Sequence, residues 1–364
     1  MSGMNAPQTD APTSAAGTSL AVRWMAFLAV VVLGLFYVKW FPYYQRAFFA
    51  AAHHSIGSSI LTGAAANPPP PSLHAALDYA QVYAKAIWKA LVLGLLVGSA
   101  IQVLIPSRSI ARALGATRFR NIATAGLLAV PSMMCTCCAA PVVAGLRARC
   151  AAPGAAIAFW LGNPMLNPAT LVFMGFVLGW QWSLLRIAFG LLMVLGIGHL
   201  VNRLGGTLSA APATAAPAPD DAGSADRGTG NLFAQWGKVA FRMTLQLVPE
   251  YAVLVVLLGA ARAWLFPHLD HGIGNDLTWI VAFAAAGSLF VIPTAGEVPI
   301  VQAMLLLGVG AGPAAALLVT LPAISAPSMA MLARSFPRGV LALVGASVFA
   351  LGVLASLAAL TLGF

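Results

Sequence analysis

Residues 122–146 read IATAGLLAVPSMMCTCCAAPVVAGL, an uncharged apolar run with two prolines and three cysteines near its centre. A run of this length and composition is typical of a segment inside a membrane. Proline has no backbone N–H and clashes with the preceding turn, so Pro131 and Pro141 predict a structural break there. Irregular backbone at membrane depth is tolerated only where it is buried in protein or lines a wet cavity. We therefore expect the function of the chain to lie at this break.

Composition identifies the solvent. Of 364 residues, 60% are hydrophobic and 8% are charged, and the mean hydropathy is +0.89. A water-soluble core cannot bury so much apolar surface, so the sequence predicts an all-α integral membrane protein with the lipid bilayer as its partner. The net charge is +10. Because the cations stand singly or in small groups at the ends of apolar runs, they indicate orientation in the bilayer, and we expect no nucleic-acid partner.

A second run, residues 277–307, has a matching interruption, VIPTAGEVP, which predicts breaks at Pro293 and Pro299. Six prolines of the first half pair with six of the second at offsets of 158 to 162 residues: 106, 131, 141, 153, 164 and 168 with 267, 293, 299, 313, 322 and 327. The apolar runs between them also correspond. The sequence therefore predicts one N-terminal span and then two copies of a unit, with about seven full spans and two broken or re-entrant hairpins in total.

The rest of the chain gives the expected segment boundaries. Stretches rich in Pro, Ala, Ser and Asp cannot pack a core, so they are expected to be a tail and a linker. The expected order is a disordered tail (1–20), an N-terminal span (21–44), an extracytoplasmic loop (45–84), repeat 1 (85–204), a flexible cytoplasmic linker (205–238) and repeat 2 (239–364).

The positive-inside rule distinguishes two topologies. With a cytoplasmic N-terminus and re-entrant hairpins, 13 of the 19 Lys and Arg residues face the cytoplasm. If both broken runs cross fully, the cations divide almost evenly, which is not typical of membrane proteins. The rule favours re-entrant hairpins. Each copy then has three spans and one hairpin, so the two copies are predicted to be inverted.

The cysteine cluster is the first candidate site. Thiolates are soft donors, so Cys135, Cys137 and Cys138 could present sulfur atoms to one metal or metalloid. The alternative is packing, because free cysteine behaves as a small hydrophobic residue.

The second break supplies the other candidate substrate-binding residues, Thr294 and Glu297. An intramembrane carboxylate is a functional candidate by default, although a protonated Glu297 could instead bond free backbone amides. Asn163 and Asn167 of GNPMLNP lie four residues apart, hence on one helical face, and are expected either to line the cavity or to bond backbone groups freed by the prolines.

Residues 130–180 and 289–332 resemble the predicted permease family that includes the organoarsenical efflux permeases and the YraQ-like permeases. The resemblance extends over about residues 87–364. Members usually carry Cys-Ser-Cys-Gly at the first break, where this chain has Cys135, Thr136, Cys137 and Cys138. The resemblance implies a permease of the bacterial inner membrane that is not an enzyme.

The cysteines add a reason to expect a thiophilic cargo. We expect export of trivalent organoarsenicals or a soft metal by alternating access, with Glu297 exchanging a proton. No Walker motif and no cofactor site is evident. The alternative is a membrane thiol oxidoreductase that uses the cysteines as a redox relay. The sequence leaves a homo-oligomer open.

Overall fold

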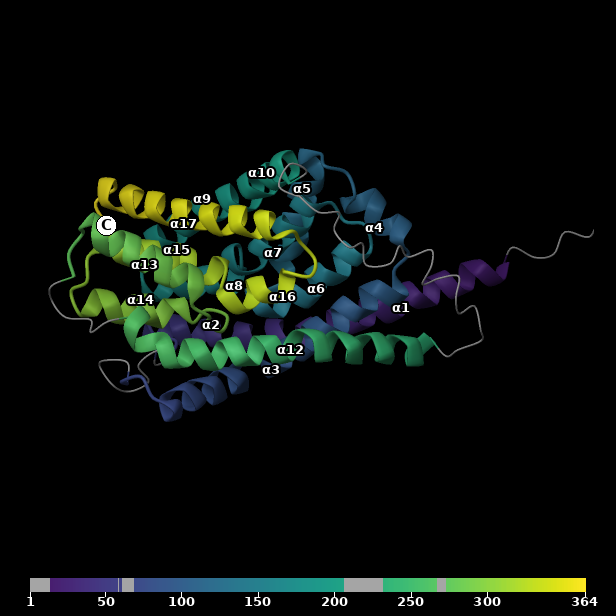
Figure 1. Ribbon diagram of the computed structural model, residues 1–364, viewed down its shortest axis with the longest axis horizontal. Helices are drawn as coiled ribbons and strands as arrows, with labels where there is room; N and C mark the ends of the chain where they lie inside the picture. Colours follow the sequence, from purple (N-terminus) through teal and green to yellow (C-terminus); the bar gives the residue numbers. More distant parts are fainter. Residues whose placement is uncertain (1–13, 58, 61–68, 206–231, 267–272) are drawn as a thin grey trace, which may run out of the picture.

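The computed structural model describes residues 14–57, 59–60, 69–205, 232–266 and 273–364, with side chains from residue 20 onward. Within these ranges all regular structure is helical and no β-strand occurs (Figure 1). The prediction of an all-α membrane protein is confirmed. Most of the expected tail and linker, residues 1–13 and 206–231, lies outside the described residues.

The N-terminal segment is one continuous helical rod. It comprises α1 (Ser14–Leu35), the π-helical turn η1 (Phe36–Trp40) and α2 (Phe41–His53). Pro42 cannot donate to the preceding turn, and the helix widens into π geometry directly before it. Lys39 lies in this widened turn and is 4% exposed.

The segment expected to be a loop, residues 45–84, is largely helical where it is described. The α2 helix continues to His53, and α3 already begins at Leu73, where the Ser72 hydroxyl caps it by accepting from the Ala75 N–H. The apolar runs mark only the membrane-embedded parts of these helices, so they underestimate the helix lengths. In the same way α12 begins at Leu232, inside the expected linker.

The helices of the two halves follow the same order. The first half contains α3 (Leu73–Leu104), α4 (Ser107–Leu114), α5 (Phe119–Ala129), the short η2 (Val130–Ser132), α6 (Thr136–Ala148), α7 (Pro153–Met165), α8 (Pro168–Val177), α9 (Trp180–Leu191), η3 (Leu192–Ile197) and α10 (Gly198–Leu204). The second contains α12 (Leu232–Leu265), α13 (Leu277–Leu289), α14 (Glu297–Leu306), α15 (Ala311–Ala323), α16 (Ala326–Leu332) and α17 (Arg338–Thr361). Neither α4 nor η2 has a counterpart among the described helices of the second half.

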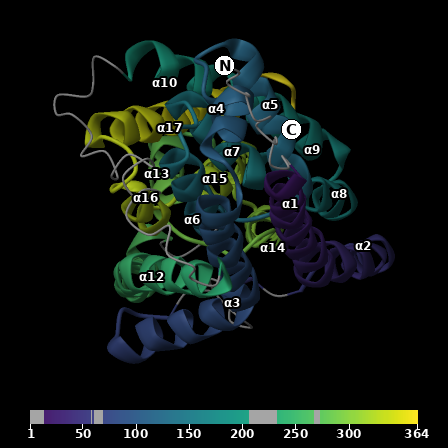
Figure 2. The same cartoon turned by 90° about the vertical axis from the view of Figure 1, so that its right-hand side faces the viewer.

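The corresponding helices α3 and α12 pack side by side and run antiparallel (Figures 1 and 2). Ser99, near the end of α3, accepts a 2.9 Å hydrogen bond from Trp236, near the start of α12. At the middle of both helices the Tyr83 and Tyr251 hydroxyls are 2.5 Å apart. This pair forms one side of the molecule, against which α6 and α16 pack.

Both broken runs return to the end of the molecule from which they start. At the first, the Ala152 N–H beyond α6 donates to the carbonyl of Leu114, which precedes α5, at 2.8 Å. At the second, the Gly310 N–H beyond α14 donates to the carbonyl of Ile273, which precedes α13, at 3.0 Å. Each broken run is therefore a hairpin of two half-helices. Figure 1 shows α4 in the right half of the molecule, and α13 and α14 in the left half.

Only two of the four predicted structural breaks lie at breaks. Pro131 lies in η2, and Pro293 lies in the non-helical stretch between α13 and α14. The predictions for Pro141 and Pro299 were wrong, because α6 continues through Pro141 and Pro299 lies in the first turn of α14. A first-turn N–H has no partner within the helix, so proline costs little there.

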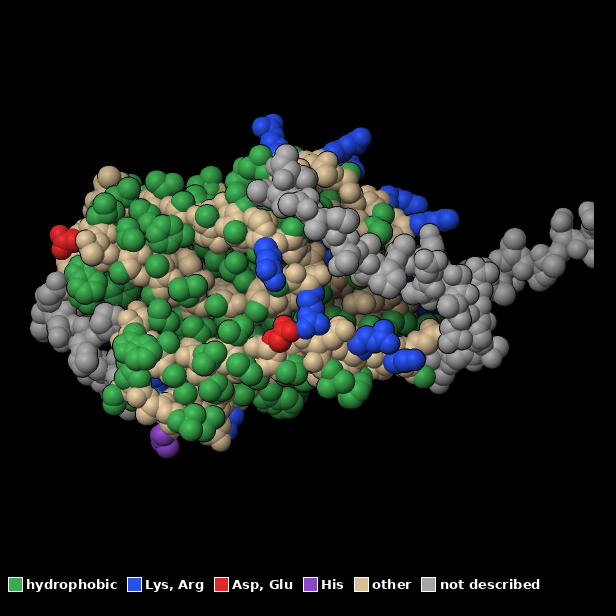
Figure 3. Space-filling view, in the orientation of Figure 1, with side chains coloured by type: hydrophobic (Ala, Val, Ile, Leu, Met, Phe, Trp, Pro, Cys, Tyr) green, Lys and Arg blue, Asp and Glu red, His purple; other side chains and the backbone are tan. Residues whose placement is uncertain are grey.

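Among the described residues, six helical segments are long and apolar enough to cross a membrane: 20–53, 73–104, 180–204, 232–265, 311–332 and 338–361. The remaining one of the seven expected spans, the apolar run at residues 152–178, is divided at Leu166 into α7 and α8. Hydrophobic side chains cover most of the face in Figure 3, and most of the visible Lys and Arg side chains lie at its centre and right. This is the surface of a multi-pass membrane protein.

Candidate functional site

The three clustered cysteines converge at the start of α6. Cys135 is the residue before the helix, and Cys137 and Cys138 lie in its first turn. The Cys135 Sγ lies 3.0 Å from that of Cys137 and 2.9 Å from that of Cys138. All three are buried and have their sulfur atoms within 4.8 Å of one another. Three sulfurs this close can ligate one soft ion. The fourth cysteine, Cys150, is exposed and apart from the cluster.

Two tyrosines of the antiparallel helices α3 and α12 form a hydrogen-bonded chain that ends at the cysteine cluster. The Tyr83 hydroxyl lies 3.1 Å from the Cys137 Sγ and is itself bonded to Tyr251. Tyr79, one turn earlier on α3, donates to the Val291 carbonyl at the second break, at 2.5 Å. The α3 helix thus contacts both hairpin tips.

Each hairpin tip contains a non-glycine residue with left-handed backbone. Met133 has φ of 49° and Ala295 has φ of 66°. Such residues are strained and persist where the surrounding structure holds them. The first tip is held by two indole donors, from Trp40 to the Pro131 carbonyl at 2.7 Å and from Trp160 to the Thr136 carbonyl at 3.0 Å.

Asn163 also stabilises the first tip. Its Oδ1 accepts from the Ser132 hydroxyl and from the Met134 N–H, the latter at 3.3 Å. Its Nδ2 donates to the Phe159 carbonyl of α7 at 2.7 Å. All the polar atoms of this fully buried amide are bonded, so it ties α7 to the break.

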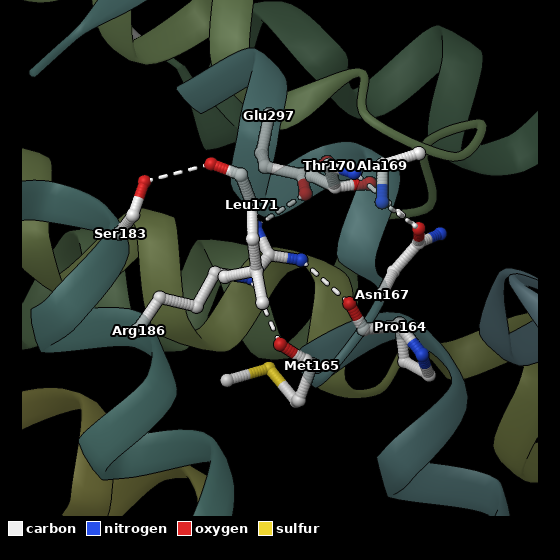
Figure 4. A network of polar contacts seen from close by, with 9 residues as sticks. All are labelled: Pro164, Met165, Asn167, Ala169, Thr170, Leu171, Ser183, Arg186 and Glu297. Carbon is white, nitrogen blue, oxygen red and sulfur yellow. Dashed lines mark hydrogen bonds and ion pairs between the residues drawn. The ribbon is translucent and has the colours of Figure 1, made fainter. Parts of the chain in front are cut away.

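Asn167 does not share a helical face with Asn163. The helix ends at Met165, and Asn167 begins the next one by accepting from the Ala169 and Thr170 N–H groups (Figure 4). Pro168 forces this break, because it disfavours helical backbone at the preceding residue. The Asn167 Nδ2 is buried and has no hydrogen-bond partner among the described residues.

Glu297, the first residue of α14, is paired with a cation that the sequence did not predict for it. The Arg186 Nη1 of α9 lies 2.5 Å from the Glu297 Oε1, and both side chains are buried (Figure 4). The same guanidinium donates to the Pro164 and Met165 carbonyls, at 2.7 and 3.3 Å. Arg186 thus joins the second hairpin to the α7–α8 break of the first half.

Thr294 meets a second unpredicted cation. Its hydroxyl accepts from the Lys39 Nζ of the N-terminal rod at 3.0 Å, and the same ammonium donates to the Tyr43 hydroxyl at 3.2 Å. Lys39 and Arg186 were detectable signals, because each is an ionisable residue close to or within an apolar run. Tyr83 and Tyr251 gave no such signal.

Two cavities meet between the hairpin tips. The larger has a volume of about 310 Å³ and is lined by residues that include Lys39, Cys135, Cys138 and Thr294. The smaller, of about 10 Å³, reaches Thr170, Arg186 and Glu297. Both are lined by Cys135 and by residues 293–295. Cys135 and Thr294 therefore line both cavities, Cys138 lines the larger and Glu297 the smaller, whereas Cys137 lines neither.

A helical membrane protein with two hairpin breaks around a buried polar space has the architecture expected of a permease. The sequence model of a family described as "predicted permease" matches residues 72–359, and the chain belongs to this family. UPF0718 protein YraQ of Escherichia coli (strain K12) is 50% identical over 344 residues, 94% of this chain and 96% of that protein. The expected membership of a YraQ-like permease family is thereby confirmed.

A more distant relative covers part of the chain. UPF0718 protein MJ0584 of Methanocaldococcus jannaschii is 31% identical over 101 residues, 27% of this chain and 28% of that protein. No solved structure matches the chain.

Proposed function

We propose that this permease exports a thiophilic cargo, such as a trivalent organoarsenical or a soft metal ion, that binds to Cys135, Cys137 and Cys138. The observation that carries the proposal is the convergence of the three buried sulfurs within 4.8 Å beside a cavity. Buried cysteines that only pack against neighbours need no such convergence.

The chemistry requires no other reactant. A trivalent arsenic that carries two hydroxides exchanges them for two cysteine sulfurs: two As–O bonds break, two As–S bonds form, and two waters leave with the thiol protons. The reverse exchange releases the cargo. A soft metal ion binds to the same sulfurs after they lose their protons.

The two hairpins support transport by alternating access between inverted repeats. The corresponding helices α3 and α12 run antiparallel, and α4, which ends at the base of the first hairpin, lies in the right half of the molecule, whereas α13 and α14 of the second hairpin lie in the left half (Figure 1). Breaks that face each other across a central site are typical of such transporters. We place the protein in the bacterial inner membrane with a cytoplasmic N-terminus, on the distribution of Lys and Arg.

The pairing of Glu297 with Arg186 favours a closing contact over a freely titrating carboxylate. An ion pair this deeply buried is stable only while both partners remain in place. In the proposed cycle, Arg186 and Glu297 separate when the second hairpin moves away from α9.

A growth and flux assay tests the proposal. A metal-sensitive host expresses the full chain, the triple Cys→Ser variant of residues 135, 137 and 138, or the matched control Cys150→Ser. We expect the parent and Cys150→Ser to confer equal resistance to trivalent phenylarsenicals or soft metals, and the triple variant to confer none at equal expression. Uptake into everted membrane vesicles should follow the same order. Equal resistance in all three strains would eliminate the thiol site.

A second candidate rests on the Cys135–Cys138 pair. Two cysteines separated by two residues at a helix start, with sulfurs 2.9 Å apart, have the spacing of redox-active thiol pairs. A thiol oxidoreductase would cycle this pair between dithiol and disulfide: an external quinone would accept the two electrons and two protons when the disulfide forms, and an external dithiol would return them and become a disulfide itself. Alkylation of the pair that depends on redox buffer but not on metalloid would favour this function.

A further inference from the structure

The N-terminal rod adds a buried positive charge to the central cavity. Lys39 lies outside residues 72–359, the part that the permease family defines. Its side chain is 4% exposed, and its hydrogen bonds within the described part of the chain go to two neutral hydroxyls, those of Thr294 and Tyr43. The same ammonium lies 5.1 Å from the centre of the Tyr43 ring.

No carboxylate of the described residues forms an ion pair with this ammonium. The ion pairs among the described residues are Arg186 with Glu297 and Arg334 with Glu250, and neither involves Lys39. A buried charge without a counter-ion costs several kcal/mol. The position therefore favours an anion beside Lys39 whenever the cavity can admit one.

The other charged side chains that line the cavity are also positive. Its ionisable side chains are Lys39, Arg46 and Lys89 together with the Tyr43 hydroxyl and the Cys135 and Cys138 thiols, and no Asp or Glu of the described residues lines it. Arg46 and Lys89 are exposed, whereas Lys39 is buried and lines the same cavity as Cys135 and Cys138. A volume of about 310 Å³ is enough for a small aromatic molecule.

We propose that the cavity selects an anionic thiophilic compound, whose soft centre binds to Cys135 and Cys138 while a carboxylate or sulfonate on the same molecule binds to Lys39. This inference rests on the proposed thiol site and adds the charge of the cargo. It makes the N-terminal rod, and not the family domain, the determinant of that charge preference.

The inference distinguishes two roles for Lys39. If the ammonium binds the cargo, its removal weakens only anionic ligands. If it instead serves as counter-ion to a cysteine thiolate, its removal weakens every thiophilic ligand alike. Two arsenicals that differ by one carboxylate separate these roles.

The experiment measures binding to the purified full-length protein in detergent by titration calorimetry. The probes are phenylarsine oxide, which is neutral, and 4-carboxyphenylarsine oxide. We expect the parent to bind the carboxylated probe about tenfold more tightly than the neutral one, a difference that one close charge pair can supply. Lys39→Gln should abolish the preference without weakening the neutral probe, whereas Lys39→Arg should keep it.

Lys85→Gln is the matched control, because Lys85 is an exposed cation of α3 that does not line the cavity. Size-exclusion chromatography verifies that each variant is folded. If Lys39→Gln does not fold, Lys39→Arg is compared with the parent instead. Equal affinity of the parent for both probes overturns the charge preference and leaves the thiol site standing. An equal loss for both probes in Lys39→Gln also overturns it. If the parent binds neither probe, the proposed function fails and this inference fails with it.

Discussion

Arg186 of α9 and Glu297 of α14 form a buried ion pair that joins the two halves of the protein at the hairpin tips. Arg186 also holds the end of α7 through the Pro164 and Met165 carbonyls. One side chain thus connects two of the breaks in the helical structure.

Breaking this pair should destabilise the protein strongly. Glu297→Gln leaves the Arg186 charge buried without a counter-ion, at a cost of about 3–5 kcal/mol in the free energy of unfolding. The Arg186→Leu, Glu297→Leu double variant should recover much of that loss, because no unpaired charge remains. Unfolding in mixed micelles measures both.

The control for the pair is Arg334→Gln in the exposed pair of Arg334 and Glu250, whose side chains are 56% and 46% exposed. Its cost should stay below about 1 kcal/mol. If the double variant loses as much free energy of unfolding as the Arg186→Leu and Glu297→Leu single variants together, the two residues do not stabilise each other.

Close helix packing behind the cysteines gives a second prediction. A Cβ atom at Gly94 of α3 would clash with the Cys138 carbonyl oxygen. Gly94→Ala should therefore push α6 away, lower the free energy of unfolding by about 1–3 kcal/mol and increase the alkylation of Cys138. Gly237→Ala on α12 is the control, because a Cβ there meets no atom within 4 Å. Equal alkylation in the two variants would contradict the packing argument.

Cysteine labelling tests the inverted orientation of the halves. Arg118 precedes α5 and Asp276 precedes α13, and both are exposed. In a Cys150→Ser background, Arg118→Cys should react with an impermeant maleimide only in everted vesicles, and Asp276→Cys only in intact cells. Labelling of both from one side would refute the inversion.

A comparison of two helix-capping residues, Asn167 and Ser325, tests whether Asn167 has a role in transport besides capping. Asn167 caps α8, and Ser325 caps α16 in the second half. Alanine at either position should cost about 1 kcal/mol of stability. If the Asn167 Nδ2, which has no partner among the described residues, donates a hydrogen bond to the cargo, Asn167→Ala should also reduce the transport flux, whereas Ser325→Ala should not. Equal flux in both variants would leave Asn167 with a capping role alone.

The prolines in the sequence predicted that the two apolar runs would break, but the sequence did not predict which side chains would pair at the breaks. The run around Pro131 and the run around Pro293 both break as the lost backbone donors predict. Proline alone does not give its position within a helix, which is why Pro141 and Pro299 were misassigned. Spacing likewise could not reveal that Pro168 would end the helix between the two asparagines.

The pairing of distant side chains was beyond the sequence. Glu297 was identifiable as an intramembrane acid, but its partner lies 111 residues away on another helix. Lys39 lies 255 residues from Thr294 and comes from a segment outside both copies. Only the packing of the rod against the hairpin tips brings these groups together.

The hydrogen bonds that close the two hairpins at their bases also bear on biogenesis. A hairpin whose ends lie together adds no crossing, so the insertion machinery has to place only the flanking spans. The backbone at residues 133–135 and 290–296 is not helical and would lack hydrogen-bond partners in lipid, so each hairpin can enter only after its neighbours have assembled. The proposed cargo site is therefore expected to be the last part of the molecule to form during synthesis.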